Sequence, residues 1–220
     1  MRRPRNGGDG MAGDRDDGAP AWLTPRGPKW RVESEQALHD NPWTALTHYK
    51  AVAPTGAPAD YYLIHFKNLA VGVLPLHEDG TVTLVGQWRF PFGTYSWEFP
   101  EGGSPAPEDP LDGARRELRE EAGLEAAEWR QILTLQLSNA SSDEIAHGYL
   151  ATGLSNVPHA PDPTEALAVV RVPFREALDA AATGRIQDAI TVAMLLRLHH
   201  MAVEGELSDG LTRAVLKDRP

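Results

Sequence analysis

The sequence predicts a mixed α+β domain, and three observations carry this prediction. Segments with the composition and alternation of β-strands fill the middle of the chain. An amphipathic helix with clear ends interrupts them near residue 110, and two further helix-like segments follow the last strand. No internal repeat is visible. This order of sheet, helix, sheet and terminal helices is typical of a single mixed α+β domain.

The composition excludes several kinds of function. A chain of 220 residues has room for one domain with a full core. Its formal charge of −10 argues against a general nucleic-acid-binding protein, because affinity for polyanions comes from clustered Lys and Arg. A small phosphorylated substrate stays open, since a bound cation reverses the local field. The absence of cysteine excludes disulfides, Cys-ligated zinc and thiol catalysis.

The first part of the chain predicts no targeting signal. Residues 1–30 are rich in Gly, Asp, Arg and Pro, and we expect them to form a disordered tail. Their Arg pair is not followed by an apolar stretch, so neither a signal peptide nor a twin-Arg signal is predicted. No run in the sequence approaches the roughly 18 apolar residues that a membrane span needs. We therefore expect a cytoplasmic protein with no membrane partner.

The remaining elements follow in order. Residues 31–57 are predicted as an N-terminal strand region, in which 43–53 is rich in β-forming residues. Residues 58–207 are predicted as the main domain, and 208–220 as a C-terminal tail. The expected strands of the main domain are ADYYLIHFKN, LAVGVLPLHEDGTVTLVGQWRF (with Glu78-Asp79-Gly80 as its hairpin turn), TYSWEFPE, EWRQILTLQLSN, EIAHGYLATGL and EALAVVRVPF. The expected terminal helices are REALDAAATG and IQDAITVAMLLRLHHMAVEG.

The helix near residue 110 has well-marked ends. Asp109 is suited to capping it, Pro110 to its first position, and Asp112 to the first turn, where negative charge is favourable. Gly123 supplies a left-handed residue at its C-terminal end. Its apolar stripe is predicted to consist of Leu111, Ala114, Leu118 and Ala122.

The same helix crowds three carboxylates together. Glu117, Glu120 and Glu121 stand at i, i+3 and i+4, where like charges repel and cost helix stability. Glu121 and Glu117 fall beside the apolar stripe, at the edge of the buried face, and Arg116 is placed to pair with Glu120. One interpretation is a solvated, salt-bridged face. The other is a metal site, because crowded carboxylates tolerate ionisation when a hard cation such as Mg²⁺ or Mn²⁺ is bound.

Two adjacent glycines before this helix favour the second interpretation. They stand in FPEGGSPAPEDP, where they permit a tight turn and a close approach to a ligand or metal. From Gly102 the chain continues with five residues, Glu108, seven residues, and then REL-R-EE-A-GL over 116–124. This pattern matches, at every fixed position, the box G-x5-E-x7-R-E-U-x-E-E-x-G-U, in which U is aliphatic. The sequence therefore resembles the Nudix hydrolase family.

The resemblance implies a fold and a metal site. The expected Nudix fold is a mixed β-sheet sandwiched between helices, here with an N-terminal strand extension. The family pattern implies that Glu117, Glu120 and Glu121 hold Mg²⁺ or Mn²⁺, with a backbone carbonyl near Glu101 or Gly102 as a further ligand. A metal in that place bridges diphosphate oxygens, neutralises charge and activates water. The resemblance also implies two supporting roles: Arg116 orients a box glutamate, and Glu108 is structural.

The resemblance extends beyond the box, over roughly residues 42–203, to ADP-ribose and nucleoside-diphosphate-sugar pyrophosphatases. It implies metal-dependent hydrolysis of a nucleoside diphosphate sugar to a nucleoside monophosphate and a sugar phosphate. ADP-ribose and GDP-mannose types both stay open, because Asn139-Ala140 stands where ADP-ribose pyrophosphatases often carry a proline. The alternative is a Nudix-fold ligand-binding regulator without hydrolase activity. The intact box, and a C-terminal stretch too short and acidic for a DNA-binding domain, argue against it.

Several residues are candidates for substrate binding. Arg89 is expected either to grip phosphate oxygens or to form a surface ion pair. Trp97 and Trp88 are candidates for stacking on a base, with a place in the core as the alternative. Gly102 and Gly103 are expected to bring the backbone close to the substrate.

The general base is expected outside the helix. If the box glutamates are metal ligands, an ionised carboxylate must come from elsewhere. The polar loop SNASSDE lies between two predicted strands, and in the resembling pyrophosphatases this loop carries a catalytic glutamate; Glu144 is the matching position and Asp143 its competitor. Glu120 is the alternative base. The resemblance further implies a homodimer in which the 43–53 segment pairs across a two-fold interface.

Overall fold

A computed structural model describes residues 20–159 and 166–217. These residues form two compact units: the smaller contains the described residues before Gln36 together with Tyr49–Tyr61, and the larger contains Gln36–His48 and the chain from Tyr62 onward. Most of the tail expected over 1–30 falls on 1–19, outside the described residues. Ala21–Leu23 form a single exposed 3₁₀ turn, η1.

Three N-terminal strands form a sheet in the order β1-β2-β3. They are β1 (Arg31–Asp40), β2 (Thr44–Val52) and β3 (Pro58–Phe66). The turn after β1 is held by Asn41, whose Oδ1 accepts hydrogen bonds from the backbone N–H groups of Trp43 (2.9 Å) and Thr44 (2.8 Å). Every residue of β1 is exposed. The predicted N-terminal strand region, 31–57, thus contains strand β1 in addition to the 43–53 segment.

The central sheet is mixed and has the order β7-β4-β9-β8. β4 pairs in parallel with β9, whereas the β4–β7 and β9–β8 pairs are antiparallel. The strands are β4 (Asn68–Pro75), β7 (Glu101–Pro105), β8 (Leu124–Gln136) and β9 (Ile145–Asn156). A second sheet, β10-β5-β6, consists of β5 (Thr81–Arg89), β6 (Thr94–Glu98) and β10 (Ala168–Pro173).

The hairpin turn expected at Glu78-Asp79-Gly80 is confirmed. Gly80 has φ +81°, which suits glycine, and the His77 N–H donates to the Thr81 carbonyl at 2.9 Å. Asp79 Oδ1 accepts from the Thr81 N–H at 3.1 Å and fixes the end of the turn. This turn connects β4 to β5 and so joins the two sheets.

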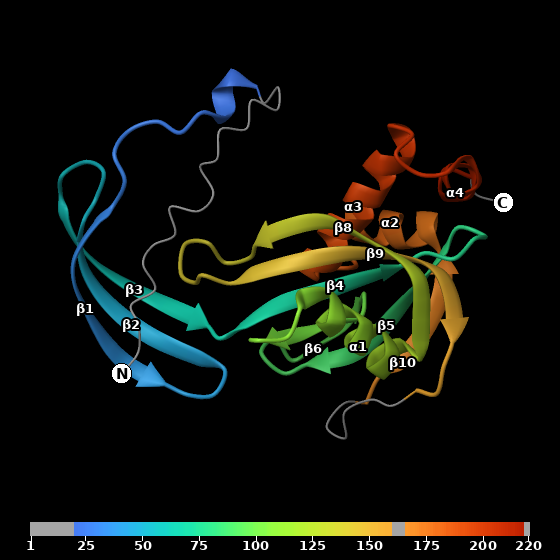
Figure 1. The fold of residues 1–220 in the computed structure, drawn as a ribbon, viewed down its shortest axis with the longest axis horizontal. Coiled ribbons are helices and arrows are strands. Elements are labelled where there is room, and N and C mark those ends of the chain that lie inside the picture. The colour runs from blue at the N-terminus through green and yellow to red at the C-terminus, as the bar shows by residue number, and fades with distance from the viewer. Residues whose placement is uncertain (1–19, 160–165, 218–220) are drawn as a thin grey trace. The chain divides into compact units, whose positions relative to one another are not determined.

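Helices cover both faces of the central sheet (Figure 1). On one face Leu118 of α1 (Pro110–Ala122) packs with Val71 and Val73 of β4. On the other face Met194 of α3 (Ala189–Val203) packs in a larger core, and the approach is so close that a Cβ on Gly72 would lie 2.5 Å from Ile190 Cγ2. The helix α2 (Phe174–Ala182) adds to that core. The predicted sandwich of a mixed sheet between helices is confirmed.

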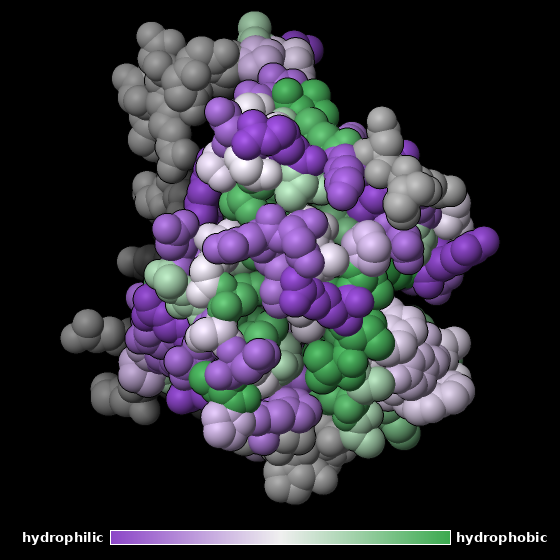
Figure 2. Space-filling model, turned by 90° about the vertical axis from the view of Figure 1, so that its right-hand side faces the viewer, coloured by the Kyte–Doolittle hydropathy of each residue, from purple (hydrophilic) through white to green (hydrophobic). Residues whose placement is uncertain are grey.

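The segment expected as a C-terminal tail, 208–220, contains a helix, and that expectation was wrong for its first half. Ser208 caps α4 (Asp209–Val215) by accepting from the Leu211 N–H. Val215 is buried in the larger core, which gives this short helix its place. Figure 2 shows the face of the molecule that lies on the right-hand side of Figure 1. On this face, hydrophobic residues lie in several areas with hydrophilic residues between them.

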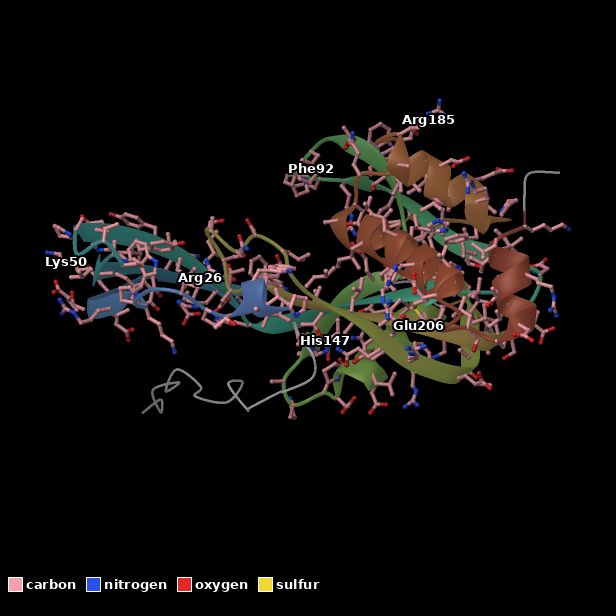
Figure 3. The ribbon with its side chains drawn as sticks, turned by 90° about the horizontal axis from the view of Figure 1, so that it is seen from above. Arg26, Lys50, Phe92, His147, Arg185 and Glu206 are labelled. Atoms are coloured by element: carbon pink, nitrogen blue, oxygen red, sulfur yellow. The ribbon has the colours of Figure 1, made fainter. Side chains whose placement is uncertain are left out.

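The β5–β6 hairpin presents large aromatic side chains to solvent. Phe90 is 97% exposed and Phe92 81% exposed, and Phe92 stands at the end of the hairpin in Figure 3. Trp88 is also exposed and contacts Tyr95 edge to face. Among the described residues no helix is long and apolar enough to cross a membrane.

Candidate functional site

The helix that carries the box begins and ends where the sequence predicts. Asp109 Oδ1 accepts a hydrogen bond from the Leu111 N–H at 2.9 Å, and Pro110 is the first helical residue. Gly123 ends the helix in the left-handed conformation, with φ +63° and ψ +36°. These ends hold α1 in one register against the sheet, and therefore place its glutamates.

Two of the three box glutamates lie at the edge of the face of α1 that packs against the sheet. Glu121 is 2% exposed and Glu117 8% exposed, as their position beside the apolar stripe predicts. Glu120 differs, since its side chain is 40% exposed. The helix thus buries two neighbouring carboxylates and leaves the third near solvent.

Both buried carboxylates reach the backbone of strand β7. Glu121 Oε2 accepts from the Glu101 N–H at 2.9 Å. The carboxylate of Glu117 lies so close to Gly102 that a Cβ there would be 2.2 Å from Glu117 Oε1. The glycine pair permits a close approach, as predicted, but from within a strand rather than a tight turn. The carboxylates therefore converge on the backbone of Glu101 and Gly102.

Arg116 connects this site to the loop before the helix. Its Nη1 donates to Glu117 Oε1 at 2.7 Å and to Glu120 Oε2 at 3.2 Å, which confirms the predicted pairing with Glu120. Its Nη2 donates to the Gly103 carbonyl at 2.8 Å and to Glu108 Oε2 at 3.2 Å. The bond with Arg116 lowers the pKa of Glu108, and the bonds with Glu108 and the box glutamates raise that of Arg116. The guanidinium fixes the orientation of Glu117.

A cavity of about 440 Å³ lies at the start of β4 and β7, beside the first turn of α3. It brings together five of the residues predicted for the site: Arg89, Glu101, Gly102, Gly103 and Glu144. It is also lined by residues for which the sequence offered no specific signal, among them Trp43, Phe66 and Asp188. Trp43 lay in the segment predicted as β-forming, and Asp188 lay inside the segment predicted as the last helix.

Arg89 forms ion pairs and also lines the cavity. Its Nε donates to Glu98 Oε1 at 2.9 Å, and its Nη2 donates to Glu98 Oε2 at 2.8 Å and to Glu101 Oε1 at 2.6 Å. Burial opposes the positive charge, but the hydrogen bonds to Glu98 and the nearby negative charges together outweigh it and raise the pKa of Arg89. The hydrogen bonds seen among the described residues use Nε and Nη2, so the ion-pair interpretation and a phosphate contact through Nη1 are compatible.

The loop between β8 and β9 carries the two carboxylates proposed as bases. Glu144 lines the cavity, and partial burial raises its pKa. Asp143 has different partners: Oδ2 lies 2.7 Å from His65 Nδ1, and Oδ1 accepts from the Phe66 N–H at 2.9 Å. Asp143 thus ties the loop to β3, while Glu144 faces the cavity.

The tryptophans proposed to stack on a base do not line this cavity. Trp97 is partly buried against the larger core, and its ring contacts Tyr95 edge to face. Trp88 is 71% exposed on the β5–β6 hairpin, so it lies neither in the core nor in the wall of the cavity. The aromatic side chains of the cavity are Trp43 and Phe66.

The geometry fits a divalent metal on the box. Glu117 and Glu121 offer hard carboxylate oxygens next to one short stretch of β7 backbone, which suits a divalent cation such as Mg²⁺ or Mn²⁺. Within the described ranges, the three acidic residues whose ligand atoms all lie within 4.8 Å of one another are a different set, Glu98, Glu101 and Asp188.

Comparison with known proteins agrees with this arrangement. The sequence model of the NUDIX domain matches residues 66–193, which include the box, the loop with Glu144 and the residues that line the cavity apart from Trp43. The chain belongs to the Nudix family. The resemblance inferred from the box is thereby confirmed, as is the expectation of a Nudix hydrolase.

Individual Nudix relatives are similar over most of their lengths. An ADP-ribose pyrophosphatase of Mycobacterium tuberculosis is 33% identical over 170 residues, which cover 76% of this chain and 81% of that protein. A GDP-mannose pyrophosphatase of Yersinia enterocolitica is 31% identical over 138 residues, which cover 58% of this chain and 71% of the relative. A crystal structure described as an ADP compounds hydrolase shares the fold, with a TM-score of 0.73 at 18% identity over 84% of this chain and all of that one.

Proposed function

We propose that this Nudix protein hydrolyses the diphosphate bond of a nucleoside diphosphate sugar, of the ADP-ribose or GDP-mannose type. The observation that carries the proposal is the convergence of Glu117 and Glu121 on the β7 backbone at Glu101 and Gly102. These two β7 residues line the cavity together with Arg89 and Glu144. The names of the similar proteins, an ADP-ribose and a GDP-mannose pyrophosphatase, support this class of substrate.

A divalent cation, Mg²⁺ or Mn²⁺, would be held by Glu117 and Glu121, with Glu120 and the backbone carbonyl near Glu101 or Gly102 as further ligands. When bound, it supplies positive charge to the diphosphate and acidifies water. Arg116 keeps the Glu117 carboxylate in place through its 2.7 Å bond.

The side chains of the cavity have separate roles in this proposal. Arg89 is held rigidly by Glu98 and directs its remaining donor at a phosphate oxygen. Glu144 removes a proton from the attacking water, because it is a carboxylate in the cavity that is not committed to the box. Trp43 and Phe66 offer apolar surface to the base or the sugar.

The proposal includes a homodimer in the cytoplasm. All residues of β1 are exposed, including Val32 at 57% and Leu38 at 46%, and a thin sheet with such apolar side chains is stabilised by a partner surface. We propose that a second copy of the chain covers the β1–β3 sheet. Light scattering at micromolar concentration tests this, and a monomeric mass with full activity would contradict it.

The substrate class is tested by incubating the protein with ADP-ribose, GDP-mannose and related nucleotide sugars in the presence of Mg²⁺ or Mn²⁺. The expected products are AMP or GMP together with a sugar phosphate, separated by ion-exchange chromatography. A ligand-binding regulator would bind one of these compounds without turnover. Binding of that kind, with no product from any nucleotide sugar, would contradict the proposed reaction.

A further inference from the structure

Three acidic side chains outside the helical box gather at one point of the cavity wall. They are Glu98 at the end of β6, Glu101 at the start of β7 and Asp188 just before α3, and one ligand oxygen from each lies within 4.8 Å of the others. None of the three is part of the Nudix box. Glu98 and Glu101 are three residues apart in the sequence, and the fold brings Asp188 to them from a distant part of the chain.

The cluster brings three acidic groups together around one guanidinium. Arg89 is the cation that contacts it, through Glu98 and Glu101. Three carboxylates against one guanidinium leave a charge of −3 + 1 = −2 when all are ionised. Asp188 also caps α3 by accepting from the Thr191 N–H at 2.6 Å, which offsets part of its own charge.

A second, independent observation is an oxygen atom without a partner. Glu101 Oε1 accepts from Arg89, but Glu101 Oε2 is buried and has no hydrogen-bond partner among the described residues. A ligand oxygen of this carboxyl lies within 4.8 Å of one from Glu98 and one from Asp188. A buried carboxylate oxygen with no partner is unfavourable, because it has lost its hydration without gaining a hydrogen bond, so the arrangement favours a group that binds there.

We propose that Glu98, Glu101 and Asp188 form a second site for a divalent cation, separate from the one on the box glutamates. A divalent ion balances the excess charge of two, and it gives Glu101 Oε2 the partner that it lacks. Oxygen ligands suit Mg²⁺, Mn²⁺ or Ca²⁺, and oxygens within 4.8 Å of one another are close enough to share one such ion. Glu121 of the box accepts a hydrogen bond from the backbone N–H of Glu101, whereas the proposed second site uses the side chain of Glu101.

The test measures the binding of Mn²⁺ to the full-length protein. Electron paramagnetic resonance detects the Mn²⁺ that remains free in solution. It uses Asp188→Asn, because asparagine keeps the helix cap while it removes the charge. It also uses Glu101→Gln, which keeps the backbone carbonyl and the side-chain volume. Both changes are made in the wild-type protein and in a Glu117→Gln/Glu121→Gln background, in which the box site is weakened. Asp112→Asn, at an exposed carboxylate of α1, is the matched control.

We expect Asp188→Asn and Glu101→Gln each to remove one bound Mn²⁺ per chain, or to weaken it at least tenfold, in both backgrounds. Asp112→Asn is expected to bind Mn²⁺ like the wild type. Unchanged binding in both Asp188→Asn and Glu101→Gln would overturn the proposal, and so would an equal loss in Asp112→Asn. Because the readout needs no substrate, a chain that hydrolyses no nucleotide sugar but loses this Mn²⁺ would contradict only the proposed function.

Discussion

The carboxylate of Glu117 lies against the Cα of Gly102, so that a Cβ at position 102 would stand 2.2 Å from Glu117 Oε1 and 2.3 Å from its Cδ. Real side chains do not approach each other so closely. Any residue other than glycine at this place must move the Glu117 carboxylate or the β7 backbone that faces it. The position of one box glutamate thus depends on a residue fifteen positions earlier in the chain.

Gly102→Ala is therefore expected to reduce kcat/KM by about 10²-fold, the scale of a displacement of about 1 Å in a catalytic group. Steady-state hydrolysis of the preferred nucleotide sugar measures the loss, with circular dichroism as the check on folding. Gly210→Ala is the matched control, since a Cβ on Gly210 in α4 meets nothing within 4 Å. Wild-type turnover in Gly102→Ala would show that the glycine is not needed for the carboxylate.

Glu117→Gln and Glu121→Gln are each expected to lower kcat by orders of magnitude at saturating Mg²⁺ while the fold is retained. Both side chains are buried beside the β7 backbone, and glutamine keeps their volume but removes the charge that a cation needs. Glu125→Gln, at an exposed position after the helix, provides the comparison. Near-wild-type activity of either buried variant would refute the metal assignment.

Glu144→Gln is expected to lower kcat at least about 10²-fold with little change in KM, as the loss of a general base does. Burial raises the pKa of Glu144, and a base must be ionised to act. The rate in the wild type is therefore expected to fall as the pH drops through this raised pKa, at a pH above the ordinary range of a glutamate. Asp143→Asn is expected to retain this pH limb. An unchanged kcat in Glu144→Gln would return the role to Glu120.

Arg89→Ala is expected to lower the free energy of unfolding by about 3 kcal/mol, because it leaves Glu98 buried without its cation. The Glu98 side chain is 1% exposed. The double variant Arg89→Ala/Glu98→Gln is expected to recover part of this loss, as urea denaturation would show. Arg171→Ala breaks an exposed pair with Asp79 and is expected to cost about 1 kcal/mol or less. Equal costs in the two arginine variants would contradict the structural role of Arg89.

Val215→Ala is expected to destabilise the protein by about 2 kcal/mol, the scale of two buried methyl groups and the cavity they leave. Val215 is 2% exposed, whereas Val203 at the end of α3 is 58% exposed. Val203→Ala is accordingly expected to change the stability by less than about 0.5 kcal/mol. Thermal unfolding compares the two. An equally small effect at Val215 would mean that α4 does not contribute to the core.

The sequence was informative where local chemistry decides the structure. Asp109, Pro110 and Gly123 mark the ends of α1 through interactions within a few residues, and the apolar stripe places Glu117 and Glu121 at the edge of the buried face. These features depend on helix geometry alone, so they are visible without any knowledge of the tertiary structure.

Features that depend on distant parts of the chain were not visible. Strand β7 was expected as a turn because its two glycines carry no β-propensity; it exists through pairing with β4. The short helix α4 has little signal of its own and is held by burial of Val215. Asp188 reaches the cavity only because α3 packs on the sheet. Trp97, for which base stacking and a core position were both open, packs partly buried against the core.

The row of residues across β7, β4 and β9 has a consequence for how the site tolerates change. Ala70 pairs with Gly103 on one side and, in parallel, with Ala146 on the other. Backbone hydrogen bonds between the strands, rather than side-chain contacts, therefore fix the distance from the glycine pair to Glu144. Glu144 stands two residues before Ala146. One residue inserted between Glu144 and Ala146 would shift Glu144 by about 3.3 Å and turn it to the other face of the sheet. Such an insertion would keep every residue of the site but would change the distances between them. The number of residues in the strand is therefore as necessary to the active site as the carboxylates are.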